Sequence, residues 1–267
     1  MSLPIFVVDA FSDTPFRGNP AGVCVTDNPI DEALMQSFAM EMNHAETAFL
    51  HPVGPQTYGL RWFTPAQEVP LCGHATLASA HILFTEMGLS DKVTFNTASG
   101  PLTAIQRGEK IELDFPTEFV TQAQSTLQCS EALGEPVQYL GDNRMFWLAE
   151  LASEQAVRNC SPNLDLVKQL GKEGVIVTAK SDSEADDFVS RLFAPNVGID
   201  EDPVTGSAHC LLAPYWATKL GKEQMIGYQA SKRGGYVEIE YLGARVLLRG
   251  NAVTVLRGTL NLNGSVK

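Results

Sequence analysis

Two stretches of the chain are apolar at nearly every position, whichever face of a helix is considered. Residues 73–88 and 206–221 each begin and end with glycine, and each contains a single charged side chain, Glu86 in the first and Lys219 in the second. A helix that is hydrophobic on all sides has to be buried on all sides. The pattern therefore predicts two central helices, each surrounded by other parts of the protein.

Strand-like segments follow each of these stretches. They alternate between apolar and polar positions and are separated by glycines, which is typical of short strands. They lie at 93–98, 102–105 and 110–115 after the first stretch, and at 236–241, 245–248 and 252–256 after the second. A helix and then a strand also precede each stretch, at 31–42 and 47–51 and again at 164–170 and 175–179. The same order of elements is thus predicted twice.

Sequence motifs repeat together with the elements. RWFTP at 61–65 matches RLFAP at 191–195 with an offset of 130, and EVPLCGHA at 68–75 matches EDPVTGSA at 201–208 with an offset of 133. Chance can produce one such match, because glycine and proline recur in turns. Two motifs and a helix in the same order, at offsets close to half of the 267 residues, indicate a duplicated unit instead.

The predicted fold is of the α/β (α+β) class and consists of two similar lobes, each a buried helix wrapped by short strands. A polar stretch at 118–128 follows the last strand of the first copy. We therefore expect an N-terminal lobe at 1–120 and a C-terminal lobe at 121–267. A short match of Ala98-Ser99 to Ala230-Ser231 supports the alignment of the copies.

Charge and composition indicate which class of molecule the protein binds. The chain has 44% hydrophobic residues, which is enough for a full core, and its 19 basic against 31 acidic residues give a net charge of −12. No cluster of Lys and Arg is longer than the pair Lys232-Arg233. This excludes a surface that follows nucleic-acid phosphates. We expect a small-molecule partner.

The compartment and cofactors can also be predicted. No apolar run reaches the roughly 18 residues of a membrane span, and the N-terminus has no basic segment followed by a long apolar one, so we expect a cytoplasmic protein without membrane contact. Five scattered cysteines without a C-x-x-C pair predict reduced thiols, four of them small buried fillers. Neither a zinc-binding H-E-x-x-H nor a nucleotide-binding glycine motif is present, so we predict no metal and no cofactor.

Positions that differ between the copies are candidates for chemistry. Gly73 and Gly206 are retained and precede the two helices, where backbone N–H groups can approach an anion. The copies diverge around them at Val69/Asp202, Cys72/Thr205 and His74/Ser207. Among these, His74, Asp202 and Ser207 carry groups suited to proton transfer or hydroxyl donation.

Glu46 is a further candidate, because it stands directly before an apolar strand, where a carboxyl is either paired or has a raised pKa. Each candidate also has an ordinary structural explanation. Glu46 can be a paired edge residue and His74 a structural histidine. Asp202 can form a cap or turn before Pro203, and Ser207 can be a helix N-cap. The functional prediction depends on their occurring together.

Several motifs resemble those of the PhzF-like isomerases of phenazine biosynthesis, which share the diaminopimelate-epimerase fold. The motifs run in order along nearly the whole chain: GNPAGV at 18–23, NHAETAF at 43–49, RWFTP at 61–65, PLCGHATLA at 70–78 and DPVTGSA at 202–208. The resemblance implies two similar lobes, each an open β-barrel-like sheet around a central helix, with the active site in the cleft between them. It also favours a homodimer.

The resemblance implies roles for individual residues. The family's catalytic residues fall on Glu46, His74, Asp202 and Ser207. We assign substrate binding to Asn19, Gly73, Thr205 and Gly206. Glu46 would move a proton on a small carboxylated metabolite, and the backbone N–H groups at the two glycines would hold the carboxylate.

Two alternatives remain open at this point. Epimerases of this fold use two cysteines as opposed acid and base, so Cys72 could serve as one partner in an epimerase or racemase. Thr205 occupies the second position, and a hydroxyl cannot replace a thiolate. The other alternative is a catalytically idle member that only binds or scaffolds.

Overall fold

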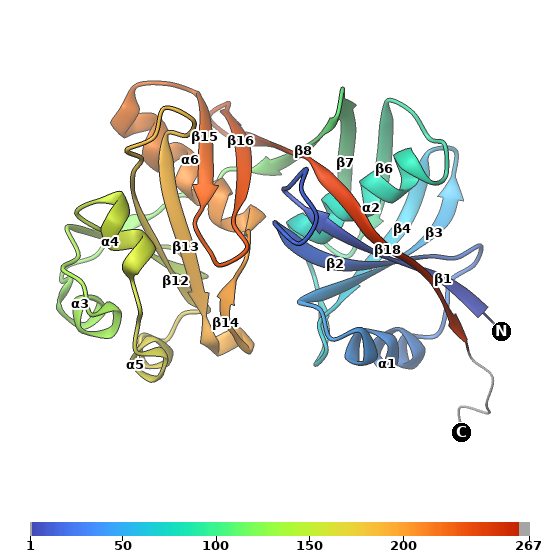
Figure 1. Ribbon diagram of the computed structural model, residues 1–267, viewed down its shortest axis with the longest axis horizontal. Coiled ribbons are helices and arrows are strands. Elements are labelled where there is room, and N and C mark those ends of the chain that lie inside the picture. The colour runs from blue at the N-terminus through green and yellow to red at the C-terminus, as the bar shows by residue number, and fades with distance from the viewer. Residues whose placement is uncertain (1, 262–267) are drawn as a thin grey trace. The chain divides into compact units, whose positions relative to one another are not determined.

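The computed structural model describes residues 2–261, which form two compact units (Figure 1). Unit 1 contains the described residues up to Asp114 and those from Arg249 onward, and unit 2 is Phe115–Leu248. Among the described residues, no helix combines the length and the apolar composition that a membrane-spanning helix needs.

The division into units differs in one respect from the predicted lobes 1–120 and 121–267. The first boundary lies close to the predicted one, but the chain returns to unit 1 near its end. The reason is β18 (Ala252–Asn261), which pairs antiparallel with β1 (Ser2–Ala10) along the whole of β1. The last predicted strand of the second copy therefore belongs to the sheet of unit 1.

The sheet of unit 1 has the strand order β18-β1-β2-β3-β4-β6-β7-β8, and β5 lies beside β4. Only the pairs β2/β3 and β4/β6 are parallel. The strands after β1 are β2 (Asn19–Val25), β3 (Glu46–Gly54), β4 (Thr57–Phe63), β5 (Glu68–Val69), β6 (Lys92–Thr97), β7 (Gly100–Arg107) and β8 (Lys110–Pro116).

Unit 2 repeats this topology with the order β9-β10-β11-β12-β13-β15-β16, and β14 lies beside β13. Its parallel pairs are β11/β12 and β13/β15, at the same places as in unit 1. The strands are β9 (Thr121–Gln122), β10 (Tyr139–Asp142), β11 (Phe146–Glu150), β12 (Gly174–Lys180), β13 (Phe188–Ala194), β14 (Ile199–Asp202), β15 (Gln224–Gln229), β16 (Gly235–Tyr241) and β17 (Arg245–Gly250). The predicted duplication is confirmed, with β9 in the place that β18 takes in unit 1.

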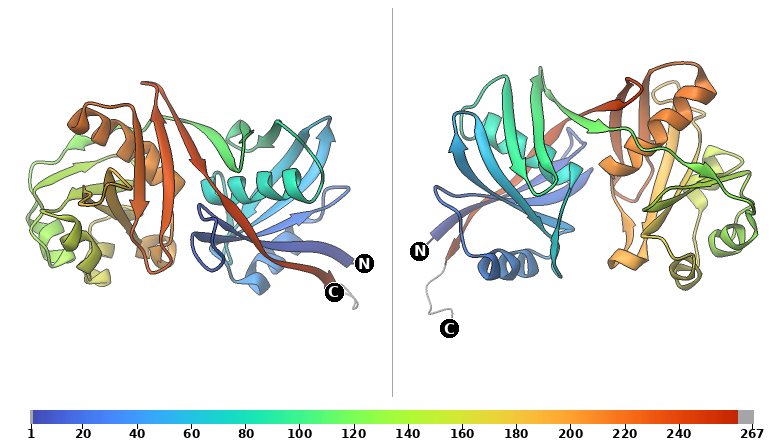
Figure 2. Two further views of the ribbon diagram at one scale, coloured as in Figure 1. Left: turned by 45° about the horizontal axis from the view of Figure 1, so that its top comes forward. Right: turned by 180° about the vertical axis from the view of Figure 1, so that it is seen from behind.

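Each unit surrounds one central helix, as the apolar pattern predicts. In unit 1 the helix is α2 (Gly73–Thr85), which packs against β1, β2, β3, β7 and β18 and is buried around its circumference (Figure 2). In unit 2 it is α6 (Gly206–Leu220), which packs against β15 and β16. The sheet of each unit therefore has to curl, because a flat sheet would cover only one side of such a helix.

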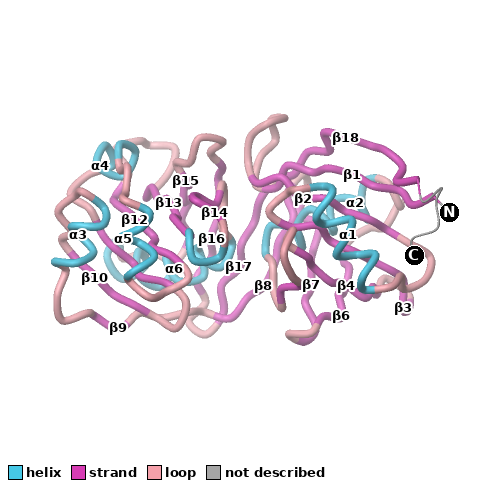
Figure 3. Tube along the Cα trace, turned by 90° about the horizontal axis from the view of Figure 1, so that it is seen from below, coloured by secondary structure: helices cyan, strands magenta, loops and turns pink. Residues whose placement is uncertain are grey.

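The opposite face of each sheet is covered by shorter helices. In unit 1, the helix on this face is α1 (Glu32–Met42) (Figure 3). It buries Met35 and Phe38 against Cys24 and Phe49 of the sheet. Asp31 caps this helix by accepting a hydrogen bond from the N–H of Ala33. The corresponding helices in unit 2 are α3 (Leu127–Leu133), α4 (Glu154–Asn159) and α5 (Leu164–Gln169), with a 3-10 turn η1 (Pro195–Val197).

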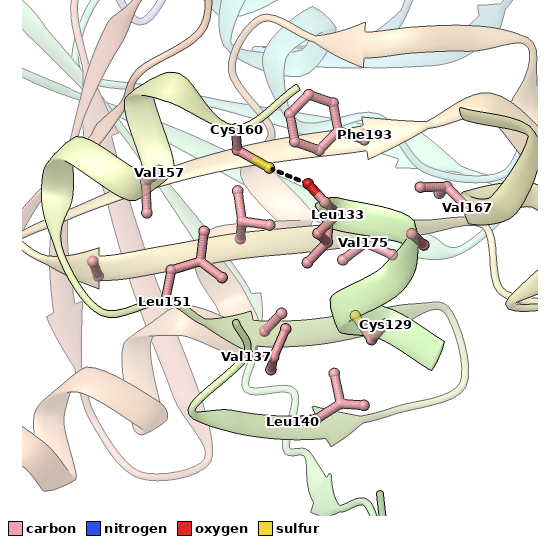
Figure 4. Packing of buried hydrophobic residues seen from close by; sticks show 14 of the residues in the cluster. Cys129, Leu133, Val137, Leu140, Leu151, Val157, Cys160, Val167, Val175 and Phe193 are labelled. Atoms are coloured by element: carbon pink, nitrogen blue, oxygen red, sulfur yellow. Dashed lines mark hydrogen bonds between the residues drawn. The ribbon is translucent and has the colours of Figure 1, made fainter. Parts of the chain in front are cut away.

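The cysteines are free and buried, as predicted. Burial raises the thiol pKa to between about 11 and about 12 for Cys24, Cys129, Cys160 and Cys210. Figure 4 shows Cys129 and Cys160 within the apolar cluster under α3, α4 and α5, where the Cys160 thiol donates to the carbonyl of Leu133 at 3.7 Å. These thiols fill space in the core and are poor nucleophiles at neutral pH.

An ion pair recurs in the two units at the motif that revealed the repeat. Arg61 of β4 binds Glu68 of β5 through two hydrogen bonds of 2.7 and 2.6 Å. Arg191 of β13 binds Glu201 of β14 in the same way, at 2.7 and 3.1 Å. Such bidentate pairs fix geometry. In each unit the pair ties the short strand that leads to the central helix onto the main sheet.

A glycine substitution tests how closely β12 and β13 pack. A Cβ added at Gly174 would overlap the backbone carbonyl of Phe193, which cannot rotate away. We expect Gly174→Ala to destabilise the protein by about 1–3 kcal/mol, which a shift of the urea unfolding midpoint would show. In the matched variant Gly54→Ala, the added Cβ meets only Thr57 at 3.8 Å, so its midpoint should stay at the wild-type value. Equal midpoints for the two variants would contradict the packing described here.

Candidate active site

Three predicted site residues of unit 1 lie at the beginnings of elements. Asn19 is the first residue of β2, Glu46 is the first residue of β3, and His74 is the second residue of α2. Because β2 and β3 are parallel neighbours, both begin at the same edge of the sheet, and Glu46 pairs with Ala21 there. The topology thus gathers residues that are far apart in sequence.

The imidazole of His74 stands between the other groups. Its Nε2 lies 3.3 Å from Oε2 of Glu46. On the other side of the ring, Nδ1 lies 3.2 Å from the side-chain nitrogen of Asn19 and 3.6 Å from Sγ of Cys72. The structure thus brings Glu46, Cys72 and His74 together in unit 1.

Burial makes His74 a neutral group. The residue is 4% exposed, and burial, together with the nearby His44, lowers its pKa to about 3. The side chain of Glu46 is more accessible, at 19% exposure. Glu46 is therefore the accessible member of the pair, and His74 is the buried, uncharged member beside it.

Close packing holds the backbone beside Glu46. Thr47 is fully buried, and a Cβ added at Gly22 of β2 would come within 2.9 Å of its hydroxyl oxygen. Only glycine lets β2 approach β3 here, which gives the GNPAGV motif a structural role.

Glu46, Cys72 and His74 also carry atoms of the kinds that bind metal ions, all within 4.8 Å of one another. Nδ1 of His74 faces the amide nitrogen of Asn19, and Nε2 lies 3.3 Å from Oε2 of Glu46. The absence of a metal stays a prediction.

In unit 2, Asp202 and Thr205 are bonded to each other. Asp202 is the last residue of β14 and Thr205 is the N-cap residue of α6, and both are buried. The hydroxyl of Thr205 donates a short hydrogen bond to Oδ2 of Asp202. Thr205 therefore orients the carboxylate of Asp202.

Gln229 at the end of β15 completes this arrangement, and sequence reasoning missed it. Its Oε1 accepts from the N–H of Thr205 at 2.9 Å, and its Nε2 donates to the carbonyl of Asp202 at 2.7 Å and to the hydroxyl of Thr205 at 3.1 Å. The residue is fully buried. The sequence offered one signal for Gln229: it is a polar residue at a position of β15 where the alternation of the strand places side chains in the core.

Serines clamp the loops that lead into both central helices. The hydroxyl of Ser99 donates to the carbonyl of Pro70 at 2.7 Å, and that of Ser231 donates to Pro203 at 2.8 Å. These are the serines of the short repeated Ala-Ser match, whose structural role is now clear.

Ser207 is not the N-cap of α6, so that structural explanation is wrong. It is the second helical residue, it is half-buried, and its side chain has no hydrogen-bond partner among residues 2–261. Neither N-cap residue, Cys72 or Thr205, makes a side-chain capping bond. The helices start at Gly73 and Gly206, and the cap side chains leave their first N–H groups uncovered.

The counterpart of Glu46 in unit 2 carries no carboxylate. Thr47 pairs with Phe63 in unit 1, and Val175 pairs with Phe193 in unit 2. Gly174 therefore takes the place of Glu46. The two units have the same framework but different polar side chains.

A family model described as phenazine biosynthesis-like protein (PhzC-PhzF) matches residues 8–258. The chain belongs to this family. An uncharacterized isomerase of Halalkalibacterium halodurans is 52% identical to it over 265 residues, covering 98% of this chain and 100% of that protein. The human phenazine biosynthesis-like domain-containing protein is 42% identical over 286 residues, covering 97% and 99%.

Solved structures agree with this assignment. A PhzF-family protein of Enterococcus faecalis is 41% identical and superimposes with a TM-score of 0.95, covering 98% of this chain and 100% of that one. A hydroxyproline epimerase from Agrobacterium vitis, at 12% identity, has a TM-score of 0.64 over 99% of this chain and 94% of its own, which shows a shared fold. The protein is thus an isomerase of the PhzC-PhzF family with the epimerase-like fold.

The contacts of Gln229 predict its contribution to stability. In Gln229→Leu, the N–H of Thr205 and the carbonyl of Asp202 lose their buried partner, so we expect a loss of about 2–4 kcal/mol in urea denaturation. Gln224→Leu changes the same residue type at the exposed start of β15 and should leave stability unchanged. A Gln229→Leu protein as stable as Gln224→Leu would show that these bonds contribute nothing.

The two buried histidines predict how stability depends on pH. Burial lowers the pKa of His74 to about 3 and that of His209 to about 4, against 6.5 in the unfolded chain. As pH falls from 6.5 to 5, the unfolded chain takes up protons that the folded protein does not. The free energy of unfolding should therefore fall by about 1.4 kcal/mol per pH unit for each histidine.

Urea midpoints at several pH values in this range would test this dependence. His209→Gln keeps a donor that can reach the carbonyl of Thr205 but cannot titrate. Its slope should be smaller than that of the wild type by about 1 kcal/mol per pH unit, with His74 and His81 still contributing, and an unchanged slope would contradict the assignment.

Proposed function

We propose that this protein is a cofactor-independent isomerase that transfers a proton within a small carboxylated metabolite, with Glu46 as the catalytic base. The observation that supports it most is the carboxylate of Glu46, partly exposed at the start of β3 and backed by the neutral, buried imidazole of His74. A carboxylate in such surroundings is suited to accept and return a proton.

The proposed reaction has two steps. Glu46 removes a proton from a carbon next to an unsaturated or carbonyl-bearing centre, and the C–H electron pair spreads into the conjugated system. The carboxylic acid of Glu46 then gives the proton to another carbon of that system, which restores the carboxylate. No electrons leave the substrate, so neither an oxidant nor a redox cofactor is required.

The substrate carboxylate would bind at the starts of the central helices. The N–H groups that follow Gly73 and Gly206 lie at the positive ends of helix dipoles, and the cap residues Cys72 and Thr205 do not cover them. These features allow a protein with a net charge of −12 to hold an anion locally.

In this proposal Asp202, Thr205 and Ser207 act on the same substrate as Glu46. The half-buried Ser207 has a hydroxyl that can donate to the substrate, and Asp202, oriented by Thr205, can polarise it or relay a proton. For residues of both units to act on one substrate, the active site has to lie in a cleft between the lobes. That cleft is expected from the family resemblance and stays a prediction. We also propose a cytoplasmic homodimer, which the frequency of C2 dimers among soluble enzymes supports.

Epimerisation with Cys72 as one partner is less well supported. Cys72 is 7% exposed and its sulfur faces Nδ1 of His74, and the second thiol position holds Thr205, whose hydroxyl is bonded to Asp202. Full activity of Cys72→Ser would exclude this alternative.

Deuterium exchange tests the assignment of the base. We would incubate the protein in D₂O with a panel of small unsaturated or amino-acid-derived carboxylates and follow isotope uptake by NMR. In Glu46→Gln, the loss of the proton acceptor should slow exchange by about 10²- to 10⁴-fold. Glu41→Gln, on the exposed face of α1, is the matched control and should exchange at the wild-type rate.

Two results would count against the proposal. Exchange that persists in Glu46→Gln would remove Glu46 as the base. Unchanged exchange in both Asp202→Asn and Ser207→Ala would show that unit 2 does not act on the substrate.

A further inference from the structure

The two ring nitrogens of His74 face groups of opposite hydrogen-bonding character. Nδ1 lies 3.2 Å from Nδ2 of Asn19, an amide nitrogen that can only donate. Nε2 lies 3.3 Å from Oε2 of Glu46, an oxygen that accepts when the carboxyl is ionised. A neutral imidazole has one N–H and one lone pair, so these neighbours determine which nitrogen carries the proton.

We propose that Asn19 is a positioning residue that holds His74 as the Nε2–H tautomer, so that the ring proton is on the nitrogen that lies 3.3 Å from Oε2 of Glu46. The amide N–H of Asn19 occupies the lone pair of Nδ1, and the single ring proton must then be on Nε2. Asn19 would act through His74 and not by binding the substrate, which revises the role expected from the sequence. The kinetic part of this inference rests on the proposed function, but the tautomer does not.

Cys72 supports the same tautomer. Its sulfur lies 3.6 Å from Nδ1, and a protonated thiol donates weakly to such a lone pair. Both neighbours of Nδ1 are thus groups able to donate. Asn19 itself has no exposed surface, so its amide is sheltered from exchange with water and from direct contact with a ligand.

The tautomer matters for the chemistry of Glu46. With the proton on Nε2, a neutral donor lies next to the carboxylate of Glu46, at 3.3 Å. In the other tautomer a nitrogen lone pair would lie next to the carboxylate, and the two would repel each other. Asn19 therefore determines which kind of group His74 presents to Glu46, without placing a positive charge beside it.

Nitrogen NMR of histidine side chains reads the tautomer directly. In protein labelled with ¹⁵N-histidine at pH 7, His74→Gln identifies the signals of His74 by their loss. We expect Nδ1 of the wild type to have the shift of an unprotonated ring nitrogen and Nε2 that of a protonated one. The reverse pattern would overturn the proposal whatever the enzyme's activity, and so is distinguishable from failure of the proposed function.

Asn19→Asp provides a second test with a nearly isosteric side chain. A carboxylate accepts where the amide donated, so Nδ1 should gain a proton and the NMR pattern should change. With the substrate identified by deuterium exchange, kcat should fall by about 10- to 100-fold with KM within about twofold of the wild type. Asn28→Asp makes the same change at an exposed loop position and should alter neither quantity.

The alternative role gives the opposite kinetic result. If Asn19 bound the substrate, Asn19→Asp would raise KM, leave kcat near its wild-type value and leave the His74 pattern unchanged, and the proposal would be overturned. The wild-type spectrum decides the tautomer even if this variant does not fold.

Discussion

Each unit is organised by the need to bury a helix on every side. Neither α2 nor α6 has a polar face, so water has to be kept from the whole circumference. Strands from distant parts of the sequence supply that cover, and the sheet curls as a result. The helix ends are then the places where the interior meets polar groups, and His74, Thr205 and Ser207 lie at the N-terminal ends.

At the start of each central helix, the carbonyl of the N-cap residue is hydrogen-bonded to a side chain four residues later, and this side chain differs between the two units. The first carbonyl of α2, that of Cys72, accepts from the hydroxyl of Thr76 at 2.6 Å. The corresponding carbonyl of α6, that of Thr205, is bonded to Nδ1 of His209 at 2.7 Å. The hydrogen bond is retained while the side chain that makes it has changed.

The sequence predicted those parts of the structure that produce a pattern within a short stretch of the chain. The two central helices, α1, α5, eight of the described strands and the repeat follow from periodicity and offsets, whereas α3, α4 and the other strands were not predicted. The grouping of Glu46 with His74 follows from a resemblance carried by contiguous motifs. Gln229 could not be predicted in the same way. Its role depends on groups 24 and 27 residues away that only the folded chain brings to its amide.

The return of β18 to unit 1 was also beyond the sequence pattern. The apolar and polar residues of β18 alternate as they do in the strands before it. This pattern does not indicate whether β18 pairs with a strand of unit 1 or of unit 2. The place of Gly174 opposite Glu46 was missed for a related reason. Only the pairing register of β12 and β13 aligns Gly174 with Glu46.

The path of β18 has a consequence for the order in which the protein is made. Unit 2 is one continuous segment, so the ribosome delivers all of it before β18 emerges. Unit 1 begins first but is completed last, and one edge of β1 stays without its partner for the intervening synthesis, on the order of 10 seconds at typical rates of translation. During that interval an exposed strand edge can pair with another nascent chain. A factor that shields β1 would therefore affect the yield of folded protein and leave its final stability unchanged.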